Sequence, residues 1–343
     1  MSSRRRRVLV VMHPTLVPPD SLAGSDPRRV DEWRTEYDVI SALRAAGHEV
    51  QKLGVGDSLT GLRAALLERK PEVVFNLLEE FNGIVSYDRH VVAFLELMQQ
   101  PYTGCNPRGL LLSRDKVLCK QLLSYHRIPT PRFAVFRRGA RFRLPRELRV
   151  PLFVKSATDD ASLGIARNSL VADMGKLAER VQFIHEQLGS DALVEEYIAG
   201  RELYVGMFGN ERITCLPTWE LHFGTLPAIA TRKVKWDRRY QQKHGIRTDA
   251  AAGLDAALQT RVERLSRRIY RALHLSGYAR LDFRLRADGE IYLLEANANP
   301  NLAADEDFAA AAAAMGLDYR AMLERIMRLG CDYQAEWRMY DAG

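Results

Sequence analysis

The 343-residue chain is poor in cysteine and has no long apolar segment. Its four cysteines stand far apart with no C-x-x-C pair, so neither a zinc site nor a disulfide framework is indicated. The longest apolar run, the alanine stretch that ends at Met315, is far shorter than the roughly 20 residues of a membrane-spanning helix. Only about six apolar residues follow the basic N-terminus, too few for a signal peptide, so we expect a soluble, cytoplasmic protein without a membrane partner.

Acidic residues are also fewer than basic ones, 43 against 50, which gives a net charge of +7. The cations are spread along the chain, and no basic helix interleaved with aromatic residues is evident, so we expect no nucleic-acid partner. A phosphate-bearing small molecule suits the surplus better. With 47% hydrophobic residues, the chain has enough apolar material for two or three folded domains, which excludes a disordered or fibrous protein.

Buried strands alternate with helices in residues 1–112. The predicted elements are a strand over 7–12, a helix over 33–46, a strand over 48–55, a helix over 59–69 and a strand over 73–78. The nearly continuous apolar strands are typical of a parallel sheet, so this region is predicted to be an open α/β domain. Its loops at 13–32 and 79–88 follow strand ends, where such sheets bind ligands.

The pattern changes to α+β from residue 113. We expect a small central domain over 113–200 and a C-terminal domain over 201–343. The predicted elements are a helix from 113 to about 125, strands over 132–136 and 151–155, a helix over 173–188, a strand over 192–198, paired strands over 202–208 and 212–221, a polar segment over 225–248, a helix over 254–273, a hairpin over 277–297 and two closing helices.

The hairpin over 277–297 contains the strongest chemical signal. Asp288-Gly289 is a two-residue turn signal, and the register that it predicts places Asp282 opposite Glu295 and Arg280 opposite Asn297. Two carboxylates across a ladder repel each other unless a cation lies between them, and hard oxygen ligands suit Mg²⁺.

Two points about this hairpin stay open. An exposed pair of solvated acids is the alternative to a metal site, and a three-residue turn would shift the register. In the predicted register the opposite face of the hairpin packs on the core; its residues are Leu281, Phe283, Leu285, Tyr292, Leu294 and Ala296. Arg280 lies on the carboxylate face and could stabilise negative charge beside the metal.

These residues resemble a known family. Residues 294–300 read L-E-A-N-A-N-P and, with R-x-D at 280–282, resemble the metal-binding end of ATP-grasp ligases, specifically the D-alanine–D-alanine ligase branch. Other pieces follow in the family's order over roughly residues 73–330: N-L-L at 76–78, P-Y-T-G at 101–104, D-K at 115–116, F-V-K at 153–155, and V-E-E-Y-I at 194–198 followed by Glu202. Each piece alone is weak, whereas the ordered set is specific. The resemblance implies an ATP-grasp fold with ATP between two subdomains.

The resemblance also implies which residues approach the ATP phosphates. Lys116 and Lys155 match the two family lysines, one from each subdomain. Ser162 lies in the segment that matches the small-residue loop over the phosphates. Lys235 matches a lysine of a mobile segment and would meet the γ-phosphate.

The base, the ribose and the metal would have separate partners. The Glu195 side chain and the Glu196 backbone would accept the adenine amine, and the N–H of Ile198 would meet a ring nitrogen. Glu202 would bind the ribose hydroxyls. The implied metal ligands, for two Mg²⁺ ions that Mn²⁺ can replace, are Asp282, Glu295 and Asn297. Arg280 would hold the oxyanion of a tetrahedral intermediate.

The sequence departs from the D-alanine pattern around the substrates. The usual histidine- and glycine-rich loop after the third strand is replaced at 79–90, and Asn301 stands where the family has glycine. Asp305 and Glu306 lie near the position of a family serine, where they would repel an amino-acid carboxylate and favour an amine or guanidinium.

We therefore expect an ATP-dependent carboxylate–amine ligase that acts on amino-acid or peptide substrates through an acylphosphate and forms a homodimer. One alternative is a D-alanine–D-alanine ligase with altered substrate loops. Another is an inactive ATP-binding regulator, which would have no need to keep the complete set of metal and lysine residues.

Overall fold

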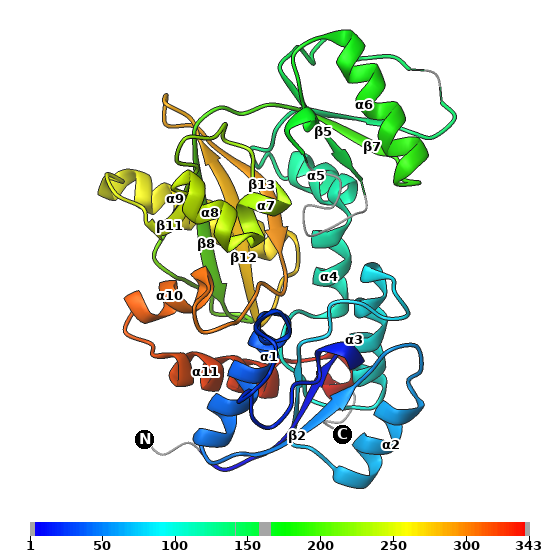
Figure 1. Cartoon of the computed structure of the whole chain (residues 1–343), viewed down its shortest axis with the longest axis vertical. Helices are drawn as coiled ribbons and strands as arrows, with labels where there is room; N and C mark the ends of the chain where they lie inside the picture. Colours follow the sequence, from blue (N-terminus) through cyan, green and yellow to red (C-terminus); the bar gives the residue numbers. More distant parts are fainter. Residues whose placement is uncertain (1–3, 141, 158–165, 340–343) are drawn as a thin grey trace.

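The computed structural model describes residues 4–140, 142–157 and 166–339 and contains three β-sheets that follow one another along the chain (Figure 1). The N-terminal sheet and the central sheet lie at opposite ends of the molecule, and the C-terminal sheet lies between them. Within the described ranges, no helix has both the length and the apolar character needed to cross a membrane.

The N-terminal sheet is parallel, with β1 (Arg7–Met12) between β2 (Glu49–Gly54) and β3 (Val73–Asn76), as predicted. Its helices are α1 (Pro27–Ala45), α2 (Thr60–Arg69) and α3 (Asp88–Leu97), with 3-10 turns at Pro14–Leu16 and Val85–Tyr87. Helix α1 begins earlier than predicted because Asp26 caps it, accepting a hydrogen bond from the Arg28 N–H at 2.9 Å, and Pro27 suits the first helical position. The loop after β1 is therefore shorter than the predicted 13–32.

A capping residue also divides the helix that was predicted from 113 to 125. The structure has α4 (Pro107–Arg114) and α5 (Lys116–Tyr125), and the Asp115 side chain caps α5 by accepting from the Leu118 N–H. The cap places Lys116 at the first position of α5.

The central sheet is antiparallel, in the order β4-β7-β5-β6. Its elements are β4 (Phe133–Phe136), β5 (Leu152–Ser156), a 3-10 turn (Arg167–Ser169), β6 (Leu170–Val171), α6 (Met174–Gln187) and β7 (Ala192–Glu196). Helix α6 packs Leu177, Val181 and Ile184 into one apolar cluster with Val154 and Val194 of the sheet. The small α+β unit predicted for this part of the chain is confirmed.

The C-terminal sheet has the order β11-β10-β8-β12-β13, with β9 paired to β8. Its elements are β8 (Arg201–Phe208), β9 (Thr214–Cys215), β10 (Trp219–His222), α7 (Arg232–Trp236), α8 (Arg238–His244), β11 (Arg247–Ala250), α9 (Ala256–Ala272), β12 (Tyr278–Leu285) and β13 (Ile291–Asn297). The single strand predicted over 212–221 is wrong, because Pro217 separates β9 from β10. The polar segment 225–248 contains two helices and an edge strand.

The β12–β13 hairpin reaches the predicted pairing by a different route. Its turn has three residues rather than two, since residues 286 and 290 pair around it. This would shift the register by one residue, but a β-bulge next to Asp282 restores it. The pairs are then Asp282 with Glu295 and Arg280 with Asn297, as predicted.

The side chains of β13 that face the core differ from those predicted. Tyr292 and Leu294 were predicted to be core residues, but Ile291 and Leu293 are the buried ones. Leu294 instead lines a cleft on the other face of the sheet. A shift of one residue turns every side chain to the opposite face, which is why the three-residue turn has this effect.

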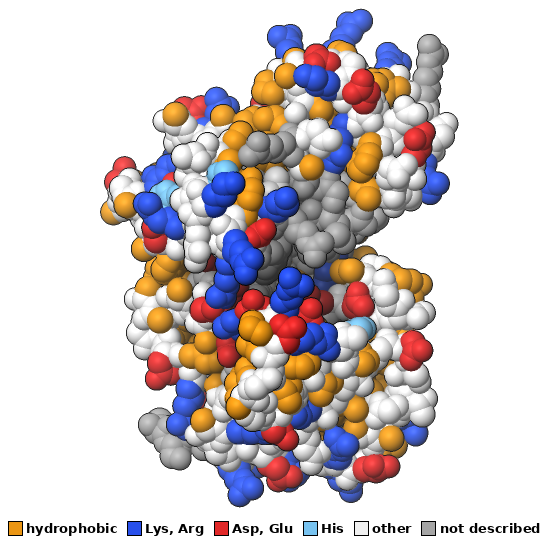
Figure 2. All heavy atoms as spheres, in the orientation of Figure 1, with side chains coloured by type: hydrophobic (Ala, Val, Ile, Leu, Met, Phe, Trp, Pro, Cys, Tyr) orange, Lys and Arg blue, Asp and Glu red, His pale blue; other side chains and the backbone are white. Residues whose placement is uncertain are grey.

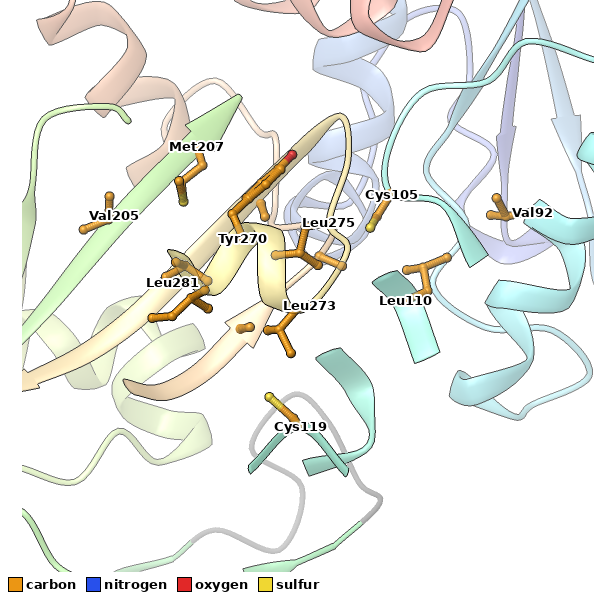
Figure 3. Close-up of a cluster of buried hydrophobic side chains, with 14 of the residues drawn as sticks. Val92, Cys105, Leu110, Cys119, Val205, Met207, Tyr270, Leu273, Leu275 and Leu281 are labelled. Atoms are coloured by element: carbon orange, nitrogen blue, oxygen red, sulfur yellow. The ribbon is translucent and has the colours of Figure 1, made fainter. Parts of the chain in front are cut away.

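The core joins the parts of the chain that are distant in sequence. Figure 3 shows Tyr270 of α9 and Leu273, which follows that helix, near Leu281 of β12, with Cys105 between Leu275 and Leu110. All four cysteines are free thiols, as expected. Of the two closing helices, α10 (Asp307–Ala314) contacts β8 and β11 of the C-terminal sheet, and α11 (Tyr319–Asp332) packs on α1 and β3.

Candidate active site

An open cleft lies between the central and C-terminal sheets and encloses about 830 Å³, including space open to solvent. Basic and acidic side chains gather near this hollow, in the middle of the face shown in Figure 2. Apolar side chains form one wall: Pro131, Phe153, Ile198, Ile229 and Leu294. Apolar side chains beside the C-terminal end of β7 suit a purine base.

Two carboxylates face each other across β12 and β13 at one end of the cleft. The Lys235 Nζ lies 3.5 Å from Asp282 Oδ2 and 4.0 Å from Glu295 Oε2. The Lys116 Nζ lies 3.7 Å from Glu295 Oε1. Burial alone would raise the pKa of Glu295, but Lys116, Lys235 and Lys155 lower it to about 2, so the carboxylate is ionised.

Arg280 adds a guanidinium to this end of the cleft. It donates to Asp282 through Nε at 2.8 Å and through Nη2 at 3.1 Å, and it lies over the Tyr204 ring at 4.6 Å. Burial lowers the pKa of Arg280, but Asp282 more than offsets this, so the pKa is raised. The arginine is therefore a fixed positive charge next to the paired carboxylates.

Asn297 completes the group predicted to bind metal. Its side-chain nitrogen is buried and has no hydrogen-bond partner within the described part of the chain, so the amide is available to a ligand. Among the described residues, no three His, Cys, Asp or Glu side chains converge on one point. The candidate metal set therefore consists of two carboxylates and one amide, a donor set of hard oxygens that fits Mg²⁺ with phosphate oxygens completing the coordination.

A buried charge cluster lies at the other end of the cleft. Glu195 on β7 is only 3% exposed, and its carboxylate contacts Lys120 Nζ at 2.8 Å and Lys155 Nζ at 3.0 Å. Lys120 also donates to Thr130 Oγ1 at 2.6 Å. Burial raises the pKa of Glu195, but the two lysines outweigh this and lower it. Lys155 was predicted to approach the ATP phosphates, and its ammonium contacts Glu195 in this structure.

The residue proposed for the ribose is also paired. Glu202 accepts from Arg284 Nη2 at 2.7 Å and from the Tyr204 hydroxyl at 3.1 Å. Burial raises the pKa of Glu202 even though Arg284 opposes this shift. Arg284 is held in turn by the Gly200 carbonyl at 3.0 Å, which orients the pair toward the cleft that both residues line.

Most of the predicted nucleotide residues come together here. Lys116, Lys155, Glu195, Glu196, Ile198, Glu202, Lys235, Asp282 and Glu295 all line the cleft. Ser162 lies outside the described residues. Lys120 and Arg284 were missed, although Lys120 follows Lys116 by one helical turn on α5 and could have been found from that spacing.

The 301–306 segment, which precedes α10, differs from its prediction. Asp305 was expected to present an uncompensated negative charge, but its Oδ2 accepts from Arg238 Nη2 at 2.6 Å and lies 3.7 Å from Arg34 Nη1. The expectation fails because partners from α8 and α1 are remote in sequence. Glu306 differs from Asp305, because burial and the neighbouring carboxylates of Asp307 and Asp305 raise its pKa to about 6.

Contacts with α1 hold this segment in place. Asn301 accepts a hydrogen bond from the Thr35 hydroxyl at 2.7 Å, and the Ala304 N–H donates to Asp38 at 3.0 Å. Near the altered loop after β3, Glu80 lies 3.4 Å from His13. Helix α1 of the N-terminal domain thus fixes the position of the 301–306 segment.

Comparisons with known proteins agree with this geometry. Residues 122–328 match the family model for the C-terminal part of D-Ala–D-Ala ligases. The chain is 34% identical over 307 residues to an uncharacterised protein, y4sG, of Sinorhizobium fredii, with 88% of each chain covered. It is 32% identical over 310 residues to a D-alanine–D-alanine ligase of Nitratidesulfovibrio vulgaris, covering 87% of this chain and 95% of the other.

The fold also matches a crystal structure of D-alanine–D-alanine ligase from Bacillus anthracis complexed with ATP, with a TM-score of 0.74 and 21% identity. The match covers 98% of this chain and all of the other. These relatives show that the chain is an ATP-dependent ligase that forms carbon–nitrogen bonds. The chain belongs to the D-alanine–D-alanine ligase family of the ATP-grasp class.

Proposed function

We propose that the protein joins the carboxylate of one amino acid or peptide to the amine of another, with hydrolysis of ATP to ADP and phosphate. The observation that carries this proposal is the cleft in which Lys116 and Lys235 contact the Asp282–Glu295 pair and which Lys155 also lines. Three ammonium groups in a cleft with two carboxylates suit a polyphosphate and its metal.

ATP is proposed to lie along the cleft with its base at the apolar wall. The adenine amine would meet Glu195 and the Glu196 carbonyl, and a ring nitrogen would meet the Ile198 N–H. Glu202, held by Arg284, would accept hydrogen bonds from the ribose. Lys155 contacts the base-side carboxylate Glu195 and would also reach the phosphates, so it would link the two ends of the nucleotide.

Asp282, Glu295 and Asn297 are proposed to hold Mg²⁺, for which their oxygen donors fit. The bound metal would neutralise phosphate charge. Lys235 and Lys116 neutralise the same carboxylates in this structure, so a metal would free both ammonium groups to contact phosphate oxygens.

The proposed chemistry has two steps. An oxygen of the substrate carboxylate attacks the γ-phosphorus, the bond to the β–γ bridging oxygen breaks, and an acylphosphate and ADP form. The amine then attacks the acyl carbon, loses a proton, and expels phosphate to leave an amide. Arg280, which is fixed by Asp282, would stabilise the oxyanion of the tetrahedral intermediate.

For the acceptor we propose a basic or peptidic amine in place of free D-alanine. The support is Glu306, which lies near the position of a family serine and has further acids beside it. Arg238 and Arg34 compensate the charge of Asp305, so Glu306 is the main acidic group of this segment. D-alanine–D-alanine ligation is the second candidate, favoured by the 32% identity to a ligase of that name.

We also propose domain boundaries at residues 112 and 200, because each of the three sheets lies wholly within one of the resulting ranges. Asp282 and Glu295 both belong to the C-terminal domain, whereas the cleft is lined by residues of the central and C-terminal domains.

A screen of acid and amine pairs tests the proposed function. Purified protein would be mixed with Mg-ATP and pairs of D-amino acids, L-amino acids and dipeptides, and ADP, phosphate and product masses would be measured. We expect an amide product in equal amount to ADP for at least one pair. ATP binding with no amide from any pair would favour the inactive regulator and refute the ligase.

A further inference from the structure

Most of the net positive charge of the chain lies in one short segment. Residues 132–149, here named the arginine segment, contain seven arginines, one glutamate and no lysine. The segment therefore has a net charge of +6, against +7 for all 343 residues. The other 43 lysines and arginines are spread along the chain, as expected, but 42 acidic residues balance them, so the remainder of the protein is close to neutral.

The described arginines of this segment are exposed, and the Arg138 guanidinium also donates to the Gly189 carbonyl at 3.0 Å. The exposed arginines outside the single undescribed position are Arg132, Arg137, Arg138, Arg143, Arg146 and Arg149. Across the described ranges, none of these six forms an ion pair with a carboxylate. Several like charges held together without counterions leave a strong local positive potential.

The backbone of the segment is fixed to the central sheet. Leu148 is buried and Leu144 is partly buried, and both pack in the cluster formed with α6. The Leu148 N–H also donates to the Pro145 carbonyl at 3.1 Å. These anchors leave Arg143, Arg146 and Arg149 outside the core, so the charges are presented from a supported loop.

The segment is separate from the nucleotide cleft. It contains β4 and the loop that follows β4, and it shares its packing with α6, whereas none of its described arginines lines the cleft. Basic side chains stand along the end of the molecule that holds α6 and β5 (Figure 2). ATP binding does not account for this surface.

We infer that the arginine segment is a docking surface for a nucleic-acid strand. The guanidinium group binds phosphate with two parallel hydrogen bonds, and a nucleic acid supplies one phosphate per nucleotide to a row of them. Phe142, which is 38% exposed and packs on Phe136 at 4.8 Å, offers an aromatic edge beside the charges.

Other anionic partners fit less well. A membrane surface needs apolar side chains that enter the lipid, and only Phe142 and Val150 of this region are large apolar groups that are well exposed. An acidic polypeptide offers carboxylates at irregular intervals and no base to stack on an aromatic ring. Both are included as probes in the test.

The test measures binding of a fluorescent 20-nucleotide single-stranded RNA to the full chain by anisotropy at several salt concentrations. The expected slope of log K against log salt is about −3 to −4, because each phosphate contact to a single strand contributes about −0.7. The triple variant Arg143→Gln, Arg146→Gln, Arg149→Gln should bind at least tenfold more weakly, with a slope shallower by about 2.

The matched control has the same change of charge elsewhere. Arg264, Arg268 and Arg271 are exposed on α9, and the triple change to Gln there should leave RNA affinity within twofold of the unchanged protein. ATP affinity and the melting temperature, measured on both variants, should stay unchanged. Fully folded protein that binds no RNA at low salt would overturn the inference.

Two further outcomes would also overturn it. Equal weakening by both triple variants would show a response to net charge alone. Binding to poly-glutamate or to vesicles with anionic lipid at concentrations where RNA does not bind would assign the surface to another class of partner.

Discussion

The nucleotide end of the cleft and the 301–306 segment balance their charges in different ways. At the nucleotide end, Glu195 is 3% exposed and lies between two lysines. In the 301–306 segment, the Asp305 side chain is 41% exposed, so its carboxylate contacts solvent as well as Arg34 and Arg238. A buried charge must be paired with an opposite charge, which restricts the residue types that can stand at such positions. Half-exposed charges can change at little cost in stability, so they can differ between ligases with different substrates.

The largest effect is expected from Glu295→Gln, at the carboxylate pair. The change keeps the size of the side chain but removes a charge that Asp282 and the lysines are arranged around, so ATP-dependent product formation should fall by at least about 100-fold. Glu290→Gln is the control, because Glu290 is an exposed acid next to the turn of the same hairpin. Product formation and melting temperature would be compared. An active Glu295→Gln protein would contradict the metal assignment.

Lys155→Ala should weaken ATP binding by about 10- to 100-fold, since a desolvated ammonium makes a strong charge-assisted contact with phosphate. Lys176→Ala, an exposed lysine on α6, should bind ATP normally. Isothermal titration with ATP measures both variants directly. If the two had the same affinity, Lys155 would be a structural partner of Glu195 alone.

A double-mutant cycle tests Lys120, the buried lysine that contacts Glu195. Lys120→Met leaves the Glu195 carboxylate with one counterion, so the free energy of unfolding should fall by about 3 kcal/mol and ATP affinity should weaken. Lys120→Met with Glu195→Gln removes both charges and should recover part of the stability but none of the ATP affinity. Denaturant unfolding and nucleotide titration separate the two effects. Equal stability of the single and double variants would mean that the pair is not coupled.

The 301–306 segment should govern the acceptor. We expect D-alanine to be at least about tenfold poorer than a basic or peptidic amine in kcat/KM, because Glu306 repels an acceptor carboxylate. The Asp305→Ser, Glu306→Ser variant should narrow this preference while ATP affinity stays unchanged. Steady-state assays with matched amines measure it. Efficient D-alanyl-D-alanine synthesis by the unchanged protein would refute this part of the proposal.

The smallest effect concerns pH. Burial, Asp307 and Asp305 raise the pKa of Glu306 from 4.5 to about 6, so the folded protein binds this proton more tightly than the unfolded chain does. The resulting stability is fully present below pH 4.5 and is lost as pH rises through 6, by at most about 2 kcal/mol. Glu306→Gln should make the free energy of unfolding depend less on pH between pH 4 and 7, as measured by denaturant unfolding at several pH values. An unchanged pH dependence would show that Glu306 titrates normally.

Local pattern was enough to predict most of the longer strands, the parallel N-terminal sheet and the Asp282–Glu295 pair. Apolar alternation and turn residues specify these features within a few neighbouring positions. The turn length was predicted wrongly, and the pair kept its register only because the bulge beside Glu295 offsets the extra turn residue. Compensation of this kind depends on the rest of the sheet and cannot be read from Asp288-Gly289.

Partners from distant segments could not be predicted from the chain alone. Arg238 and Arg34 meet Asp305 from two helices that are far from it in sequence, and Arg284 meets Glu202 across neighbouring strands. The charge surplus was misjudged for a different reason, since totals over the whole chain conceal its concentration in the arginine segment.

The central claim is that an oxygen of the substrate carboxylate attacks the γ-phosphorus of ATP. The direct measurement uses the acid and amine pair found in the screen, with ¹⁸O in both oxygens of the acid's carboxylate, followed by mass spectrometry of the released phosphate. The acylphosphate route predicts one ¹⁸O atom in each phosphate molecule, with ADP as the nucleotide product. Unlabelled phosphate, or labelled AMP in place of ADP, would contradict it.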